Sequence, residues 1–478
     1  MLLLNPVFYY EKIREKFANS YLAEDTTQTI VGIDCEYISS EQTDFAGLKS
    51  YFKAQKSGAP FAGLFGVLGY GGIKYFEKIP EFNASQYDFP DFFYANARAY
   101  LHFDKNSKIY SFYGDRERYY DFLVKFSTDD EAAAKEQRAK RYYDFLVKFS
   151  TDDEAAAKEQ RAKRQCKYKI LTDLEGEKAH FLKIAKRAKE YLKSGDVFQV
   201  VLSEQLKLAS DMDSLDFYRA LSEANPSPYM FHFPTPYGDV AGSSPELVCE
   251  IKEGKIYVAP IAGTRGRGKD AIEDVALERE LLNDEKELAE HKMLIDLARN
   301  DIGRVSKPKS VAVKNAMRIV RYESVMHIVS DVYGAKSDDL DAFDAVGSIF
   351  PAGTLSGTPK IRAMEIIAEL ESYKRNAYGG GIGFFHFNGD AQMAILIRSA
   401  IFARKFDAKF DAGRHNPHLD GANEPNLEGG ELDGNFAEIF VQAGAGIVID
   451  SVPEYEYKEI CKKRASVLNV FAKNAREI

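Results

Sequence analysis

Two segments in the second half of the chain have the pattern of a β-hairpin, and they limit the possible folds more than any other feature. Residues 247–251 and 256–260 are apolar runs joined across Lys-Glu-Gly-Lys. Residues 380–387 and 392–402 are joined in the same way across Asn-Gly-Asp. Such short turns connect antiparallel strands, because parallel strands need a much longer crossover. The sequence therefore predicts a substantial amount of antiparallel sheet.

Helical spacing of apolar residues accompanies these strands. Four segments show it and are predicted to be helices: 181–192, 286–299, 359–371 and 453–473. Thr358 and Pro359 stand where an N-cap residue and a proline in the first helical turn are expected. The predicted fold class is therefore mixed α/β (α+β), with most of the pattern in residues 174–478.

An identical repeat marks the amino-terminal part of the chain. Residues 119–141 recur without a change at 142–164, a unit of 23 residues. Two units are too few for a solenoid, which stacks several, and each unit ends in an Ala-rich helix former, so we expect a solvated helical insertion. We assign residues 1–173 to an amino-terminal region and residues 174–478 to a second domain.

A second unusual segment, residues 405–435, is rich in Gly, Asn, Asp, His and Pro. His415 and His418, together with nearby acidic residues, are candidate metal ligands. A flexible surface insertion is the favoured interpretation, because no helical or strand period fixes these side chains in space.

The composition excludes several classes of protein. The formal net charge is −9, so the chain lacks the broad positive field that binds nucleic acid. The four cysteines are far apart and form no Cys-x-x-Cys pair, which argues against a zinc site or a disulfide framework. The apolar run before Asn5 is too short for a signal peptide, and no stretch is long enough to span a membrane. We expect a cytoplasmic protein with no nucleic-acid or membrane partner.

Two of the predicted helices carry a pair of carboxylates on one face. Glu287 and Glu290 are three residues apart in one helix, and Glu456 and Glu459 have the same spacing in another. A single pair of this kind is more typical of a solvated helix face. Together, the two pairs could converge on Mg²⁺, which prefers one or two protein carboxylates plus water and an anionic substrate.

Three further features are compatible with a small anionic substrate. Residues 350–360 form a Gly-, Ser- and Thr-rich loop before a helix start, where free N–H groups favour an anion, although the spacing is not that of a P-loop. Arg398 is a lone charge in an apolar strand pattern, and is either half of a structural ion pair or a clamp for a carboxylate. His327, flanked by apolar residues, is more often a core histidine than a catalyst. The residues alone indicate a Mg²⁺ enzyme acting on a small anion.

Seven segments, in their order along the chain, are SSPELV, PIAGTRGRG, KELAEHKMLIDLARNDIGRV, FPAGTLSGTPKIRAMEII, YGGGIGFF, ILIRSA and VQAGAGIVIDSVPEYEYKE. They resemble the chorismate-utilising enzyme family, and the match spans residues 174–403 and 436–473. The resemblance implies large antiparallel sheets packed face to face and flanked by helices. It also makes residues 174–478 the chorismate-binding catalytic domain.

Two positions distinguish the branches of that family. Ala262 stands where aminodeoxychorismate synthases carry a nucleophilic lysine, and an alanine has no nucleophile. Gln199 stands where isochorismate and salicylate synthases carry a lysine that activates water, and glutamine is no base. The resemblance therefore favours the anthranilate synthase branch. Aminodeoxychorismate synthase component I and a non-catalytic scaffold that binds chorismate or tryptophan remain the alternatives.

The resemblance implies a role for individual residues. Implied Mg²⁺ ligands are Glu290 and Glu459, with Glu287 and Glu456 close by. Implied substrate contacts are Ala262, Gly263, Thr264, Thr354, Tyr378, Arg398, Gly444, Gly446 and Lys463. The implied catalytic positions are Glu246, His327 and Gln199. Glu246 would protonate the C4 hydroxyl of chorismate as ammonia adds at C2, and His327 would act in the elimination of pyruvate. The first role requires a raised pKa at Glu246.

A partner and an inhibitor are implied as well. None of the cysteines has the setting of a glutaminase nucleophile, so a separate glutamine amidotransferase small subunit (component II) would supply ammonia, in a heterotetramer. Feedback inhibition by tryptophan is implied by matches at Glu24, Asn225, Pro226, Ser227, Tyr229 and Met230. Asp25 stands where the family has a serine, so we expect altered sensitivity to tryptophan.

Overall fold

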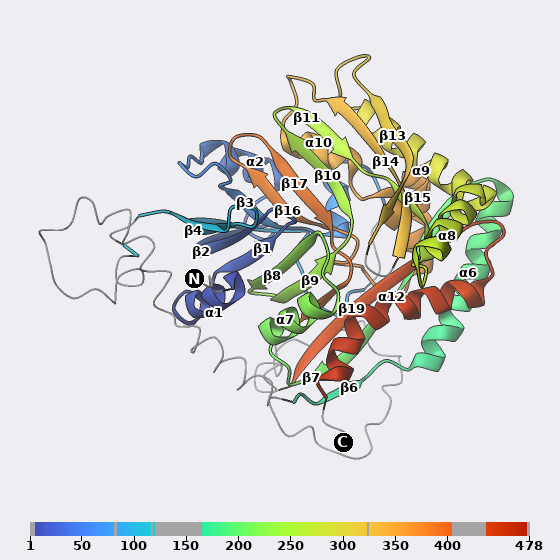
Figure 1. The fold of residues 1–478 in the computed structure, drawn as a ribbon, viewed down its shortest axis with the longest axis horizontal. Coiled ribbons are helices and arrows are strands. Elements are labelled where there is room, and N and C mark those ends of the chain that lie inside the picture. Colours follow the sequence, from blue (N-terminus) through green and yellow to red (C-terminus); the bar gives the residue numbers. More distant parts are fainter. Residues whose placement is uncertain are drawn as a thin grey trace, which may run out of the picture.

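The computed structural model describes residues 5–80, 84–115, 118–119, 165–322, 325–403 and 436–475. The two copies of the repeat, apart from Tyr119, lie outside these ranges, as does the segment 405–435 with His415 and His418. In the described ranges, helices pack against a large antiparallel sheet, so the predicted fold class is confirmed (Figure 1).

Nineteen strands in the described ranges form one hydrogen-bonded network. Their bounds are β1 (Tyr21–Glu24), β2 (Gln28–Ser39), β3 (Gly63–Leu68), β4 (Phe92–Asp104), β5 (Ile109–Tyr113), β6 (Tyr168–Ile170), β7 (Gln199–Ser210), β8 (Tyr229–Thr235), β9 (Gly238–Ser244), β10 (Leu247–Lys252), β11 (Lys255–Val258), β12 (Ile261–Gly266), β13 (Ala312–Arg321), β14 (Val325–Ala335), β15 (Gly357–Thr358), β16 (Gly381–His386), β17 (Ala391–Ile395), β18 (Ser399–Phe402) and β19 (Ala437–Ile447).

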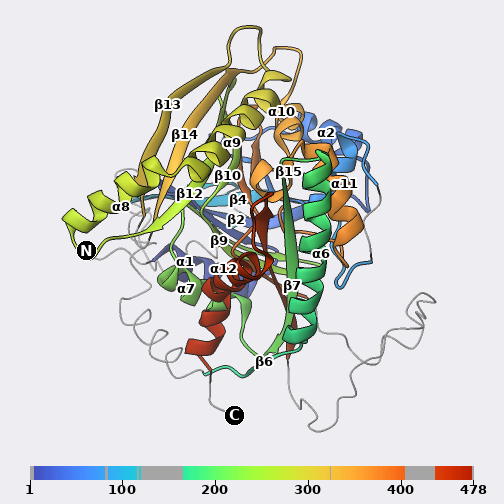
Figure 2. The same ribbon diagram turned by 90° about the vertical axis from the view of Figure 1, so that its right-hand side faces the viewer.

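The helices cover the outer faces of this network. They are α1 (Pro6–Lys16), α2 (Phe45–Ala54), α6 (Leu174–Ser194), α7 (Ser214–Ala224), α8 (Ala271–Asn283), α9 (Glu285–Gly303), α10 (Ala342–Ile349), α11 (Lys360–Leu370) and α12 (Pro453–Lys473), with short 3₁₀ helices η1 (Tyr70–Tyr75) and η3 (Gly353–Leu355). Helix α12 lies across β19 and packs against α6 (Figure 1). Helices α8 and α9 lie against β12 and β14 (Figure 2). No helix in the described ranges combines the length and apolarity needed to cross a bilayer.

The network folds back on itself into two layers. One layer runs from β2, β4 and β3 through β16, β17 and β10 to β14, and the other runs from β1 through β8, β9, β18 and β19 to β7. Buried aromatic rings fill the space between them: Phe65 in β3 and Phe233 in β8 lie with ring centroids 5.2 Å apart although their strands do not pair. Burial of such large apolar surfaces stabilises the face-to-face arrangement.

Both predicted hairpins are present, with one difference. Strand β10 pairs with β11 and β16 pairs with β17. The predicted arm 392–402 is not one strand, because β17 ends at Ile395 and β18 pairs instead with β9 and β19. Arg398 separates the two strands in a left-handed conformation with φ of 51°. The prediction that Arg398 lies within a strand was therefore wrong.

The four predicted helices are confirmed as α6, α9, α11 and α12. The predicted cap of α11 is not observed. Thr358 belongs to β15 and pairs with Gln199, and Pro359, after a cis peptide bond, takes the N-cap position with no side-chain hydrogen bond. Because Thr358 pairs with β7 and α11 begins only at Lys360, Thr358 is not the N-cap residue of this helix.

Candidate active site

The predicted catalytic and substrate-binding residues come from both layers of the sheet. Gln199 begins β7, Thr264 lies on β12 and His327 on β14. Others stand at element ends or in connections, among them Glu246 between β9 and β10 and Thr354 in η3. Hydrogen bonds and close contacts join most of them around one region.

Glu246 has the properties required of a proton donor. Its Oε1 accepts a hydrogen bond of 2.7 Å from the Thr354 hydroxyl. Burial raises the pKa of Glu246 to about 7, although the hydrogen bond from Thr354 and the charges of Lys463 and Arg398 oppose the shift. The predicted rise in its pKa is confirmed. Near neutral pH, a large fraction of this carboxyl group therefore carries a proton.

His327 is held by the neighbouring strand. Its Nδ1 lies 3.1 Å from the carbonyl oxygen of Gly263 and 3.0 Å from the hydroxyl of Thr264. Strand β12 bulges at Gly263, where φ is 72° and only glycine is unstrained. Burial lowers the pKa of His327. The ring is therefore neutral at pH 7, and a proton on Nδ1, directed at the Gly263 carbonyl, leaves Nε2 as the basic nitrogen.

The four candidate metal ligands stand at the beginnings of α9 and α12, and each pair has its own contacts. Glu290 accepts a hydrogen bond of 2.9 Å from the Gln199 amide, and Glu459 forms an ion pair of 2.6 Å with Lys463. Among the described residues, no group of three or more His, Cys, Asp or Glu side chains is close enough together to hold a metal ion. A ligand set of one or two carboxylates is nevertheless what Mg²⁺ prefers.

The electrostatics of these helix ends suit a divalent cation. Burial and then the charge of Glu290 raise the pKa of Glu287. Burial, and further the charge of Glu459, raise the pKa of Glu456, while Lys286 of α9 lowers it. The effect of Lys286 indicates that the two helix ends lie near one another. Each pair carries mutually repelling negative charge that a bound cation would neutralise.

Arg398 is a partly buried cation close to the other site residues. Its Nη1 donates hydrogen bonds to the carbonyl oxygen of Lys463 at 2.7 Å and to the hydroxyl of Ser466 at 3.2 Å. Burial lowers the pKa of Arg398, while Tyr378, Glu459 and Glu246 raise it. Its guanidinium forms no ion pair with any side chain in the described ranges. The structural ion pair is therefore not observed among the described residues, and the carboxylate clamp stays a prediction.

Two glycines of β19 allow other side chains to pack closely against this strand. A Cβ on Gly444 would lie 3.1 Å from the Tyr378 hydroxyl, and a Cβ on Gly446 would lie 2.6 Å from the Gln199 amide nitrogen. Lys463 donates a hydrogen bond of 2.9 Å to the Gly444 carbonyl oxygen, which ties α12 to β19. The glycines therefore permit the close approach of the Tyr378 and Gln199 side chains to β19.

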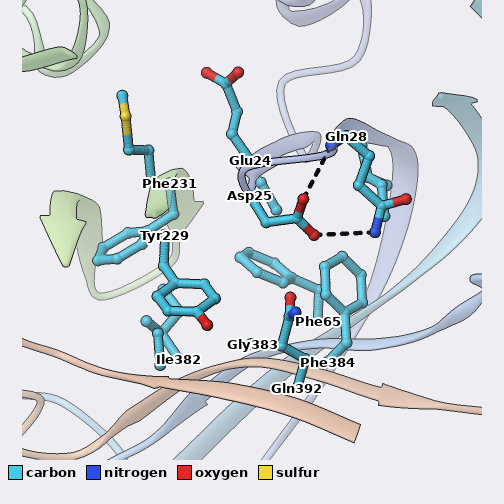
Figure 3. A pocket seen from close by; sticks show the side chains of 14 residues that line it. Glu24, Asp25, Gln28, Phe65, Tyr229, Phe231, Ile382, Gly383, Phe384 and Gln392 are labelled. Atoms are coloured by element: carbon cyan, nitrogen blue, oxygen red, sulfur yellow. Dashed lines mark hydrogen bonds between the residues drawn. The ribbon is translucent and has the colours of Figure 1, made fainter. Parts of the chain in front are cut away.

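The predicted inhibitor residues separate into two groups. Glu24, Tyr229 and Met230 line a pocket together with the rings of Phe65, Phe231 and Phe384 (Figure 3). Asn225, Pro226 and Ser227 do not line it. Rings from both sheet layers therefore line this pocket, together with the polar side chains of Glu24 and Asp25.

Asp25 has a structural task beside this pocket. Its Oδ1 accepts hydrogen bonds from the backbone N–H groups of Thr27 at 2.6 Å and Gln28 at 2.9 Å, which closes the turn between β1 and β2. Figure 3 shows its carboxylate directed toward Gln28, while the carboxylate of Glu24 points away from the aromatic rings. The additional negative charge at position 25 therefore accepts hydrogen bonds from the backbone of this turn.

Two serines around Arg398 were not predicted. Ser466 accepts a hydrogen bond from the guanidinium, and the backbone N–H of Ser243 donates one of 3.2 Å to the Arg398 carbonyl oxygen. Ser243 lies in the SSPELV segment, so this motif could have identified it as a residue of the site. Nothing in the sequence singles out Ser466 among the residues of α12.

The arrangement has clear counterparts among known proteins. A family described as chorismate binding enzyme matches residues 5–413. The chain belongs to this family. The chorismate binding enzymes similar to it include anthranilate synthase component 1 of Acetivibrio thermocellus, 48% identical over 301 residues that cover 63% of this chain and 54% of that protein. The same-named protein of Aquifex aeolicus (strain VF5) is 47% identical over 61% of this chain and 52% of its own length.

A solved structure agrees with this family assignment over nearly the whole length. The crystal structure of anthranilate synthase component I from Streptococcus pneumoniae TIGR4 matches with a TM-score of 0.66 and 27% identity. That match covers 98% of this chain and 99% of the other. The chain spans about half the length of the curated relatives it matches.

Proposed function

We propose that this chain is the large, chorismate-binding subunit of anthranilate synthase, which converts chorismate and ammonia to anthranilate and pyruvate in the first step of tryptophan biosynthesis. The observation that carries the proposal is Glu246, whose pKa of about 7 suits a general acid and which lies near the Arg398 clamp. Ala262 and Gln199, where related enzymes use lysine, support ammonia as the nucleophile. The names of the similar proteins support the same assignment.

In the proposed reaction, the residues of the chain move two protons. Ammonia adds at ring C2 of chorismate, and Glu246 donates its proton to the C4 hydroxyl, which leaves as water. The added nitrogen then loses a proton to water or to a second molecule of ammonia, which gives a neutral amine. In the second step, neutral His327 accepts the proton from C2, the C3–O bond breaks and the ring becomes aromatic. The departing enolpyruvate takes up a proton from water to give pyruvate. Arg398 and Tyr378 bind the enolpyruvyl carboxylate and hold the ring between these two groups.

We propose Mg²⁺ as the cofactor, held by Glu290 and Glu459 with Glu287 and Glu456 close by. When bound, the ion would supply Lewis-acid polarisation of the ring carboxylate. Gln199 orients Glu290 through its amide, and Lys463 orients Glu459. These side chains therefore fix the ligands before the ion binds.

The first test is an assay with the purified chain. We expect anthranilate fluorescence to appear with chorismate, Mg²⁺ and ammonium at mildly alkaline pH, and to disappear when EDTA removes the metal. Formation of the 4-amino isomer after lyase treatment would instead indicate an aminodeoxychorismate synthase. Binding of chorismate without any turnover would indicate a scaffold.

We further propose a cytoplasmic complex with a glutamine amidotransferase that supplies ammonia, and feedback inhibition by tryptophan in the pocket lined by Glu24, Tyr229 and Met230. The aromatic lining supports an indole ring as the ligand. Because the turn engages the Asp25 carboxylate, inhibition should persist despite the departure from the family's serine.

Replacing Tyr229 with alanine should weaken inhibition by tryptophan. The loss of one aromatic wall lowers the affinity about tenfold, because an aromatic contact contributes about 0.5–1.5 kcal/mol beyond the buried area. The measurement is the tryptophan concentration that halves the ammonium-dependent rate. Tyr373→Ala is the control, because Tyr373 is an exposed tyrosine outside the pocket. An unchanged inhibition curve in Tyr229→Ala would exclude this pocket.

A further inference from the structure

Asn225 does not face the pocket that its sequence motif suggests, but is joined to two elements of the active site. It is the C-cap residue of α7. Its side-chain amide donates a hydrogen bond of 2.7 Å to the carbonyl oxygen of Ser466 in α12. Its own carbonyl oxygen accepts one of 2.6 Å from the hydroxyl of Ser243 at the end of β9. Asn225 therefore links α7 to both α12 and β9.

Both partners of Asn225 also hold Arg398. The Ser466 hydroxyl accepts from the guanidinium at 3.2 Å, and the Ser243 N–H donates to the Arg398 carbonyl oxygen at 3.2 Å. The four residues thus form a closed ring of hydrogen bonds. One side of the ring holds the backbone of Arg398 and the other holds its side chain.

The backbone of Arg398 needs such support. Its φ of 51° lies in the left-handed region, which is unfavourable for a residue that carries a side chain. A strained conformation persists only where the surroundings fix it from several sides. The preceding residues are fixed by hydrogen bonds between Gly379, Gly380 and Leu396, and the ring with Asn225 fixes Arg398 itself.

We infer that Asn225 is a positioning residue, which acts through Ser466 and Ser243 to hold Arg398 where it binds the carboxylate of the substrate. The inference rests on the proposed role of Arg398 as the carboxylate clamp. Only the amide contact with Ser466 depends on the identity of residue 225, because any residue supplies the carbonyl oxygen that Ser243 contacts. The amide group is therefore the part to remove.

The experiment is a comparison of steady-state constants in the ammonium-dependent assay. Asn225→Ala should raise KM for chorismate about 3–10-fold, the equivalent of one hydrogen bond, and leave kcat within about twofold. Ser466→Ala, which removes the hydroxyl but keeps the carbonyl oxygen, should raise KM as well. Asn474→Ala is the matched control, because Asn474 is the C-cap residue of α12 and its amide donates to the Val470 carbonyl oxygen within the same helix. It should not change KM.

A double-mutant comparison separates positioning from a general loss of stability. Asn225→Ala should have no further effect on KM once Arg398 has been replaced by alanine, because the two substitutions remove one interaction. The inference would be overturned if the two substitutions raised KM independently, so that their factors multiplied in the double variant. It would also be overturned if KM were equal in wild type and Asn225→Ala. The proposed function would stand in both cases. A wild-type chain that forms no anthranilate would overturn the proposed function, and the inference with it.

Discussion

Glu246→Gln should lower kcat for ammonium-dependent anthranilate formation by about 10²–10⁴-fold, the usual contribution of a positioned general acid. Glutamine keeps the size of the side chain and an oxygen that accepts from Thr354, but it has no acidic proton for the C4 hydroxyl. Chorismate should still bind, because the carboxylate contacts at Arg398 are untouched. Initial rates from anthranilate fluorescence, with chorismate affinity measured separately, test both statements.

The pH dependence of the wild type should report the same group. Because burial holds the pKa of Glu246 near 7, the protonated, active form declines as the pH rises through that value. At a fixed concentration of free ammonia, kcat/KM for chorismate should therefore fall about tenfold for each further pH unit. The decline should be absent from the residual activity of Glu246→Gln. Glu250→Gln, the same substitution in the neighbouring strand β10, is the control. Full turnover by Glu246→Gln would remove the assignment.

Local patterns predicted the secondary structure well, because their causes are local. The hairpin of β10 and β11 follows from two apolar runs and the Lys-Glu-Gly-Lys turn. Each strand extends one residue further into this turn than predicted, so that Lys252 pairs with Lys255. Arg398 was misplaced because a left-handed φ at a residue with a side chain has no sequence signature. The cap at Thr358 failed because β7, far away in the sequence, pairs with the same backbone. Tertiary pairing therefore overrode the local capping preference at Thr358.

The site was predictable in part for the same reason. Helical spacing correctly placed Glu287 beside Glu290, since three residues make almost one turn. The partners of these carboxylates, such as Gln199, come from distant strands and were not predictable from spacing. The roles of Glu246 and His327 came from a resemblance to known motifs. The direction of the pKa shift at Glu246 was then confirmed by its burial.

Much of the site depends on a single helix, α12, and on the contacts that hold this helix against α6. This helix carries Glu459, Lys463 and Ser466, and therefore contributes to the proposed metal ligands and to the setting of Arg398. Its main polar attachment to α6 is buried. Nη1 and Nη2 of Arg464 each donate to the Glu177 carboxylate at 2.6 Å, and the Tyr457 hydroxyl donates to the same carboxylate at 2.9 Å.

Glu177→Gln should therefore lower the free energy of unfolding by about 3–5 kcal/mol, because it leaves the Arg464 charge buried without its counter-ion. Arg464 is only 2% exposed, so water cannot replace the lost carboxylate. Urea unfolding followed by circular dichroism should show the midpoint at a lower urea concentration. Glu190→Gln is the matched control on the same helix, because Glu190 pairs with Arg187 at the exposed surface. Equal midpoints for the two variants would mean that the buried pair does not hold α12 in place.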